Sequence, residues 1–158
     1  MYIKNIKIKG FRNFEENVVE FHEGINVLIG HNNAGKSNLL RAMQLVLEPH
    51  CRNRRLQTSD FCRNVELDAL IAHSPKIEIS VILANSMSDE QNDDLPMVAN
   101  WLVKMGAGYE AQLTYIFALQ ESMEEEYLNA VKNSESQQEI WNIIERKYIR
   151  YYPLAELI

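Results

Sequence analysis

The stretch that decides the fold is INVLIGHNNAGKSNLL, from Ile25 to Leu40. It opens with an almost entirely apolar run, passes through a loop with two glycines, and ends in residues with helical periodicity. Its centre, Gly30 to Ser37, fits the phosphate-loop pattern G-x-x-x-x-G-K-[ST]. We therefore expect a central strand over 25–30 that is buried on both faces, a phosphate-binding loop, and a helix over 37–47.

Each fixed position of the loop has a chemical reason. Gly30 lets the chain leave the strand sharply, and Gly35 removes a side chain where backbone N–H groups must face phosphate oxygens. Lys36 supplies a cation to the β- and γ-phosphates, and the Ser37 hydroxyl suits Mg²⁺, which prefers oxygen ligands. The helix N-terminus adds partial positive charge. A glycine turn that merely caps a helix would leave Lys36 and Ser37 unexplained, so the loop predicts a bound nucleoside triphosphate with Mg²⁺.

The flanking sequence predicts an α/β fold. Alternating apolar residues predict strands, and helical spacing and a Ser122–Glu125 capping box predict helices. We expect strands over 2–9, 17–21, 75–85, 109–119 and 148–158, a glycine turn at Gly24, and helices over 65–73, 122–133 and 136–150. The expected architecture is a mixed β-sheet carrying the phosphate loop, with a mostly helical C-terminal segment. Residues 1–88 would form the ATP-binding lobe, and residues 89–158 an insert that returns to the sheet, within one partial domain.

Composition narrows the class of protein. With 158 residues the chain can build one domain with its own core. No apolar run approaches the roughly 20 residues of a membrane span, so no membrane partner is expected. Cys51 and Cys62 lack a second ligand pair and predict reduced thiols of a cytoplasmic protein.

The charge of the chain is unevenly distributed. A net charge of −6 argues weakly against a protein that binds nucleic acid over its whole surface. However, residues 51–63 hold four arginines against one aspartate. Arg52, Arg54 and Arg55 could contact DNA phosphates, and a solvated loop is an equally good interpretation.

Four segments together carry a family resemblance: GFRNF (10–14), GHNNAGKSNLLRAM (30–43), LQTSDF (56–61) and KIEISVIL (76–83). They resemble the N-terminal head of the RecF/SMC group of ABC-type ATPases. Within that group they look most like OLD-family ATP-dependent nucleases, including the ATPase subunit of Gabija-type antiviral systems. The resemblance covers most of residues 1–85, and residues 148–158 are similar to the strand leading into the Q-loop of such heads.

The resemblance implies ATP as the nucleotide and adds residues to the site. It implies that Arg12 and Asn13 lie near the nucleotide, that Asn32 is the family's loop asparagine, and that Asp60 also lies near the nucleotide, with Gln57 a weaker candidate. Asp60 and Asp68 could ligate a metal, but helix capping or a surface position is the simpler interpretation of both. Asn33 replaces a common glycine, but asparagine tolerates left-handed backbone. The predicted cofactor-binding set is Gly30, Asn32, Asn33, Ala34, Gly35, Lys36, Ser37, Asn38, Arg12 and Asn13, and the predicted metal ligands are Ser37 and Asp60.

Departures from the family limit what the chain is expected to do alone. The sequence shows no signature motif, no Walker B strand ending in acidic residues, and no cluster of nuclease carboxylates. We expect the first lobe of a larger DNA-acting ATPase/endonuclease in DNA repair or antiviral defence. This lobe would bind ATP but hydrolyse it poorly, would meet DNA through the parent protein, and would form a homodimer or larger oligomer there. No catalytic residue is predicted. The alternatives are a stand-alone ATP-binding regulatory module that acts with a partner chain, and a degenerate P-loop protein with a structural role.

Overall fold

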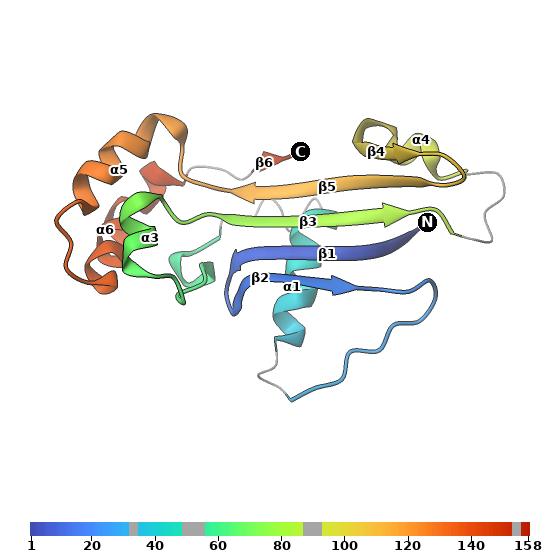
Figure 1. The fold of residues 1–158 in the computed structure, drawn as a ribbon, viewed down its shortest axis with the longest axis horizontal. Helices are drawn as coiled ribbons and strands as arrows, with labels where there is room; N and C mark the ends of the chain where they lie inside the picture. The colour runs from blue at the N-terminus through green and yellow to red at the C-terminus, as the bar shows by residue number, and fades with distance from the viewer. Residues whose placement is uncertain (32–34, 49–55, 87–92, 153–155) are drawn as a thin grey trace.

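One antiparallel sheet organises the molecule (Figure 1). The computed structural model describes residues 1–31, 35–48, 56–86, 93–152 and 156–158. The sheet has the order β2-β1-β3-β5-β4, and β6 pairs with β5. Its strands are β1 (Tyr2–Phe11), β2 (Phe14–Glu20), β3 (Ile77–Ala84), β4 (Leu102–Met105), β5 (Tyr109–Phe117) and β6 (Glu156–Leu157). The helices are α1 (Lys36–Leu47), α3 (Leu67–Ala72), α4 (Leu95–Val98), α5 (Glu124–Val131) and α6 (Gln137–Tyr151). Three 3₁₀ turns are η1 (Thr58–Asp60), η2 (Ala99–Trp101) and η3 (Glu121–Met123).

The three central strands form the core because their side chains alternate between two faces. Ile8 pairs with Ile79, and Ile79 pairs with Tyr115, so one face of β1, β3 and β5 is a continuous apolar layer. On the other face Ser80 lies opposite Thr114, and their hydroxyl oxygens are 2.9 Å apart. Strands from both predicted parts of the chain, 1–88 and 89–158, thus pair within one sheet. The predicted α/β class with a helical C-terminal part is confirmed. The sheet expected to be mixed is antiparallel in every pairing among the described strands.

Helix α1 covers the apolar face of the sheet (Figure 1). Leu39, Ala42, Leu45 and Val46 are its buried residues, and they recur at helical spacing. The helix predicted over 37–47 is therefore confirmed with its first residue at Lys36. Its N-terminus is the end that follows the glycine-rich loop, so packing on the sheet fixes where that end lies.

Whereas α4 lies beside β4 at one end of the sheet, helices α3, α5 and α6 gather at the other end and contact one another (Figure 1). An aromatic cluster connects this end to the sheet and to the segment after η1. It consists of Phe61, Phe117, Trp141, Tyr148 and Tyr152, with ring centroids 5.1–6.2 Å apart. Such aromatic pairs contribute about 0.5–1.5 kcal/mol each beyond burial. The segment 56–62 is therefore held by α6 as well as by β1.

The expected central strand over 25–30 is wrong. Residues 25–29 have no regular secondary structure, and Ile25, Val27 and Ile29 are 95%, 73% and 91% exposed. The chain leaves β2, which is an edge strand, and turns at Gly24, whose φ of 92° confirms the predicted glycine turn. The run then passes beside the sheet toward α1 (Figure 1). An apolar run becomes a strand only where a neighbouring backbone supplies hydrogen-bond partners, and none of the described strands pairs with it.

Two expectations for the second half are also wrong. The strand predicted over 148–158 begins as helix, because α6 continues through Tyr151, and among the described residues of this range only Glu156–Leu157 is a strand. Tyr148 and Tyr152 face the aromatic cluster at helical spacing, and this packing prolongs the helix. Ser122 does not cap α5, since it lies inside η3 and the N-cap residue is Met123. A side-chain cap is present instead on α6, where the Ser136 hydroxyl accepts a hydrogen bond from Glu139 N–H.

Candidate phosphate-binding site

The glycine-rich loop joins α1 at Gly35, where the backbone is left-handed with φ 87°. A Cβ atom at this position would lie 2.5 Å from the side-chain nitrogen of Asn13. Gly35 is therefore required by its φ, and any side chain here would also displace the Asn13 amide. This explains the second glycine of the motif from the geometry of this chain alone.

The first turn of α1 offers donors to an anion. Within the described residues the helix has no side-chain cap and no acidic residue in its first turn, so neither competes with an anion for its first N–H groups. The Lys36 ammonium group donates to the backbone oxygens of Gly30 and of His31, the latter at 2.8 Å. Ser37 is exposed at the same turn. The lysine therefore lies across the loop, and the helix dipole adds partial positive charge.

The turn between β1 and β2 lies against this helix end. Arg12 and Asn13 form the turn, and Arg12 adopts a positive φ of 51°. The Arg12 Nη1 group donates to the side-chain oxygen of Asn38 at 2.9 Å, and the Asn38 amide donates to the side-chain oxygen of Asn13 at 2.6 Å. Besides Lys36, a second cation, Arg12, is thus held at the first turn of α1.

Asp60 fixes the guanidinium of Arg12 from behind. Arg12 Nε donates to Asp60 Oδ1 at 2.9 Å, and Nη2 lies 2.8 Å from the same oxygen. The other carboxylate oxygen accepts the Gln57 backbone N–H at 2.8 Å, which makes Asp60 part of the capping box of η1. The backbones are also joined, because Arg12 N–H donates to the Asp60 carbonyl at 2.8 Å. Asp60 is only 8% exposed, whereas the Arg12 side chain is 37% exposed, so the carboxylate is shielded from water and the guanidinium stays accessible.

The structure brings most of the predicted set together. Arg12, Asn13 and Asn38 form one hydrogen-bonded group next to Gly35, and Lys36 bonds to Gly30. Asn32, Asn33 and Ala34 lie outside the described residues, as do Cys51 and the arginines at 52, 54 and 55. The other cysteine, Cys62, is a buried free thiol. The metal assignments to Ser37 and Asp60 stay predictions, with both Asp60 oxygens engaged by N–H donors.

Sequence reasoning placed Gln57 and Asp60 near the site and predicted Asp60 as a metal ligand, without predicting its contact with Arg12. Residues 57–60 show the spacing of a capping box, an N-cap residue followed three positions later by a carboxylate, and that spacing could have revealed the turn. The link from Asp60 to Arg12 bridges 48 residues and no local pattern contains it.

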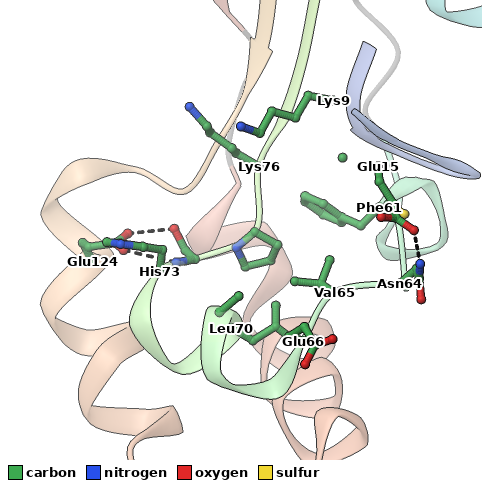
Figure 2. Close-up of a pocket in the computed structure, with 15 residues that line it drawn as sticks. Lys9, Glu15, Phe61, Asn64, Val65, Glu66, Leu70, His73, Lys76 and Glu124 are labelled. Atoms are coloured by element: carbon green, nitrogen blue, oxygen red, sulfur yellow. Dashed lines mark hydrogen bonds between the residues drawn. The ribbon is translucent and has the colours of Figure 1, made fainter. Parts of the chain in front are cut away.

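A separate cavity of about 720 Å³ lies beside Phe61 and Cys62, the residues that follow η1 (Figure 2). Its walls include Phe61, Cys62, Val65 and Leu70, and Lys9 and Lys76 lie along one side. The Ser74 hydroxyl, which also lines the cavity, donates to Glu124 at 2.8 Å. No described residue of the glycine-rich loop lines this cavity, so it is distinct from the phosphate-binding site.

One ionisable group close to the Asp60 turn stays neutral. Burial raises the pKa of Tyr115 to about 12; the positive charge of Arg41 opposes this rise, and the negative charge of Asp60 adds to it. Tyr115 therefore keeps its proton at neutral pH and adds no negative charge near the site. Across the described residues no group of three or more His, Cys, Asp or Glu side chains could hold a metal ion. Nor does any described helix have the length and apolar character to cross a membrane.

Comparison with known proteins places these features in a family. The chain is 35% identical over 81 residues to a structural maintenance of chromosomes protein 3 homolog from Plasmodium falciparum, covering 48% of this chain and 7% of that protein. It is 51% identical over 43 residues to the DNA replication and repair protein RecF of Pediococcus pentosaceus, covering 27% and 12%. It is 43% identical over 65 residues to the DNA double-strand break repair Rad50 ATPase of Pyrococcus abyssi, covering 40% and 7%.

The chain spans between 7% and 12% of the length of these three relatives. A solved structure from work on ATP-driven dimerization and DNA-stimulated activation of SMC ATPases is also similar. Its TM-score is 0.47 at 15% identity, with 95% of this chain and 97% of that chain covered.

The family model of the AAA ATPase domain matches residues 1–153. That range contains the glycine-rich loop, α1, the β1–β2 turn with Arg12 and Asn13, and the Asp60 turn. The chain therefore belongs to the AAA ATPase domain family and is related to the ATPases of DNA repair and of the SMC group.

Proposed function

We propose that this chain binds ATP with Mg²⁺ and forms the N-terminal ATP-binding part of an OLD-like, DNA-acting ATPase/endonuclease. The observation that carries ATP binding is the meeting of two cations, Lys36 and Arg12, at an uncapped helix N-terminus beside Gly35. Backbone N–H groups and cations converging at one helix end suit the oxygens of a polyphosphate. Mg²⁺ would be held by the Ser37 hydroxyl and by phosphate oxygens, with water completing its shell.

The OLD-like role is supported by the sequence resemblance over residues 1–85, and a role in DNA repair or antiviral defence follows from it. Engagement of two heads around ATP would then control DNA binding or cleavage in a homodimer or larger oligomer. The similar proteins RecF and Rad50 are named for DNA repair, which supports a DNA partner for the parent protein. In this arrangement residues 1–88 carry the nucleotide, and residues 89–158 return to the same sheet.

A binding experiment tests the nucleotide assignment. Replacing Lys36 with alanine removes charge-assisted hydrogen bonds to phosphate and should weaken ATP·Mg²⁺ binding by at least about 2 kcal/mol. Isothermal titration calorimetry measures the change, and Lys132→Ala is the matched control because Lys132 is exposed at the end of α5. Equal affinity for both variants and the unchanged chain would exclude the loop as the phosphate site.

Hydrolysis by this chain alone should be weak. P-loop enzymes need a cradle, Mg²⁺ and a group that positions the attacking water. The sequence supplies the phosphate-loop pattern at 30–37, but both Asp60 oxygens already accept hydrogen bonds from Arg12 and Gln57. A phosphate-release assay should therefore show no turnover above the Lys36→Ala control. Repeated turnovers would instead support a stand-alone ATPase module, which is the alternative function.

DNA contact through the arginines at 52, 54 and 55 is a second part of the proposal. If these residues bind phosphates, DNA affinity falls as salt rises, in proportion to the number of phosphates neutralised. Changing all three to alanine should flatten that salt dependence in a fluorescence-anisotropy titration. DNA affinity that is the same before and after the change would remove the patch from the proposal.

A further inference from the structure

Arg12 is held at the phosphate site by another residue. The geometry points to Asp60 as a positioning residue: we propose that its carboxylate fixes the guanidinium of Arg12 at the first turn of α1, ready to contact a phosphate oxygen of the bound nucleotide. This inference rests on the proposed ATP-binding function. It gives Asp60 a different task from the metal ligation expected from the sequence.

The first support is the direction of the contacts. Asp60 Oδ1 lies 2.9 Å from Nε and 2.8 Å from Nη2 of Arg12, so it contacts one edge of the guanidinium. This leaves Nη1 pointing to the helix, where it donates to Asn38 at 2.9 Å. A planar guanidinium held along one edge can turn only as a unit with its partner. The position of the carboxylate therefore decides where Nη1 lies relative to α1.

The second support is the rigidity of Asp60 itself. Its other oxygen is bonded to the Gln57 backbone, and its own carbonyl accepts the Arg12 N–H at 2.8 Å. The following residue, Phe61, forms a β-bridge with Phe11 and is buried in the aromatic cluster with Trp141 and Tyr152. Backbone and side chain of Asp60 are thus fixed independently of the nucleotide loop.

The third support is the backbone of Arg12. A non-glycine residue at φ 51° is uncommon and costs of order 1–3 kcal/mol, so it persists only when its surroundings determine it. Here the turn is held by the two Asp60 contacts, side chain and backbone, and by the Asn13–Asn38 bond. A turn that its surroundings hold in this one conformation presents the cation at a fixed position, which is what a preorganised anion contact requires.

The test is a double-mutant cycle between Asp60 and Arg12, read by ATP·Mg²⁺ affinity. Asp60→Ala and Arg12→Ala should each weaken binding about tenfold, since each removes one charge-assisted contact from the bound state. If Asp60 acts through Arg12, adding Asp60→Ala to Arg12→Ala should change affinity less than about twofold. Asp60→Asn keeps one acceptor oxygen for Nε and Nη2 of Arg12 but loses the acceptor for the Gln57 N–H, so it should recover part of the loss. Asp68→Asn in α3 is the matched control because Asp68 is exposed and carries the same charge.

A nucleotide-independent readout accompanies the affinities. The Arg12 Nε–H donates to a carboxylate that is nearly buried, so its ¹H–¹⁵N signal should exchange slowly with water, and rapidly in Asp60→Ala. If the unchanged chain binds no ATP, the proposed function fails and the positioning role fails with it. If ATP binds but the losses add fully, Asp60 acts independently of Arg12 and only this inference is overturned. Asp60→Asn could instead raise the Mg²⁺ concentration that ATP binding requires, by the same factor in the presence of Arg12 and in Arg12→Ala. That result would assign Asp60 to the metal and would also overturn this inference.

Discussion

Two apolar runs of this chain have similar composition, but one is a buried central strand and the other is exposed. The run IEISVILA, at 77–84, is β3 and lies between β1 and β5, whereas the run INVLI, at 25–29, is exposed and unpaired within the described residues. Valine and isoleucine favour strands in both. The difference is position: β3 has a hydrogen-bonding neighbour on each side, and 25–29 follows the edge strand β2. Strand propensity is expressed only where the tertiary arrangement supplies backbone partners.

The hydrogen-bonding groups of the two runs also find their partners in different ways. In β3 the backbone bonds lie in the ladders to β1 and β5. At the start of the other run Asn26 makes local bonds, accepting from the His22 N–H at 2.9 Å and donating to the His22 carbonyl at 2.7 Å. The first segment is stabilised by long-range pairing and the second by a turn.

The largest expected effect is the loss of stability when an aspartate is introduced into each of the two runs. Val81 is fully buried, so Val81→Asp places an unpaired carboxylate in the core and should cost about 4 kcal/mol or more, or prevent folding. Val27→Asp is the matched change at a side chain that is 73% exposed, and its effect should stay within about 0.5 kcal/mol. Urea unfolding followed by circular dichroism measures both. A comparable loss for Val27→Asp would mean that 25–29 is buried in solution and that the two runs do not differ in burial.

A smaller effect is expected when two glycines are compared: Gly24, which precedes the exposed run 25–29, and Gly35, which precedes α1. Gly24 and Gly35 both have positive φ, 92° and 87°, where an L-residue costs roughly 1–2 kcal/mol. A Cβ at Gly24 meets nothing within 4 Å, whereas at Gly35 it meets Asn13. Gly35→Ala should therefore lose more stability than Gly24→Ala. It should also weaken ATP binding, whereas Gly24→Ala should not, as calorimetry with both variants would show. Equal losses of ATP affinity would indicate that the Asn13 contact does not shape the site.

A local effect is expected from Asn26→Ala. The bonds that it removes are exposed and close only the turn after β2, so global stability should change by no more than about 0.5 kcal/mol. Hydrogen exchange of the His22 amide should become faster while the amides of β3 stay unchanged. Faster exchange in β3 as well would show that the turn supports the sheet.

The smallest effect concerns surface charge on the sheet. A hydrogen bond from Lys4 is the main cause that lowers the pKa of Glu110; partial burial opposes it and Lys104 reinforces it. The pair therefore stabilises the folded chain above the ordinary glutamate pKa of about 4.3, and this contribution is lost as pH falls through the lowered value. Lys4→Ala should raise the pKa of Glu110 in an NMR titration, with Lys132→Ala as control. An unchanged Glu110 titration would show that the Lys4 contact is not formed in solution.

Local sequence determined much of this protein. The pattern of Gly30 to Ser37, the periodicity of α1, the turn at Gly24 and the alternation in β1, β3 and β5 are short-range features, and each follows from backbone sterics or side-chain period. The same holds for the part of the site made by neighbours in sequence, the lysine and the helix N-terminus. The RecF/SMC relationship could likewise be recognised from short segments.

Only the tertiary structure decided the rest. The exposure of 25–29 depends on which strand ends beside it, and the helical ending at Tyr151 depends on the aromatic cluster that Tyr148 and Tyr152 join. The Arg12–Asp60 pair joins residues 48 positions apart through the bridge between Phe11 and Phe61. Such contacts form because distant segments are brought together by burial of the apolar face of one sheet, and that burial sums over the whole chain. No window of sequence contains that sum, which is why the cradle could be predicted and the support behind it could not.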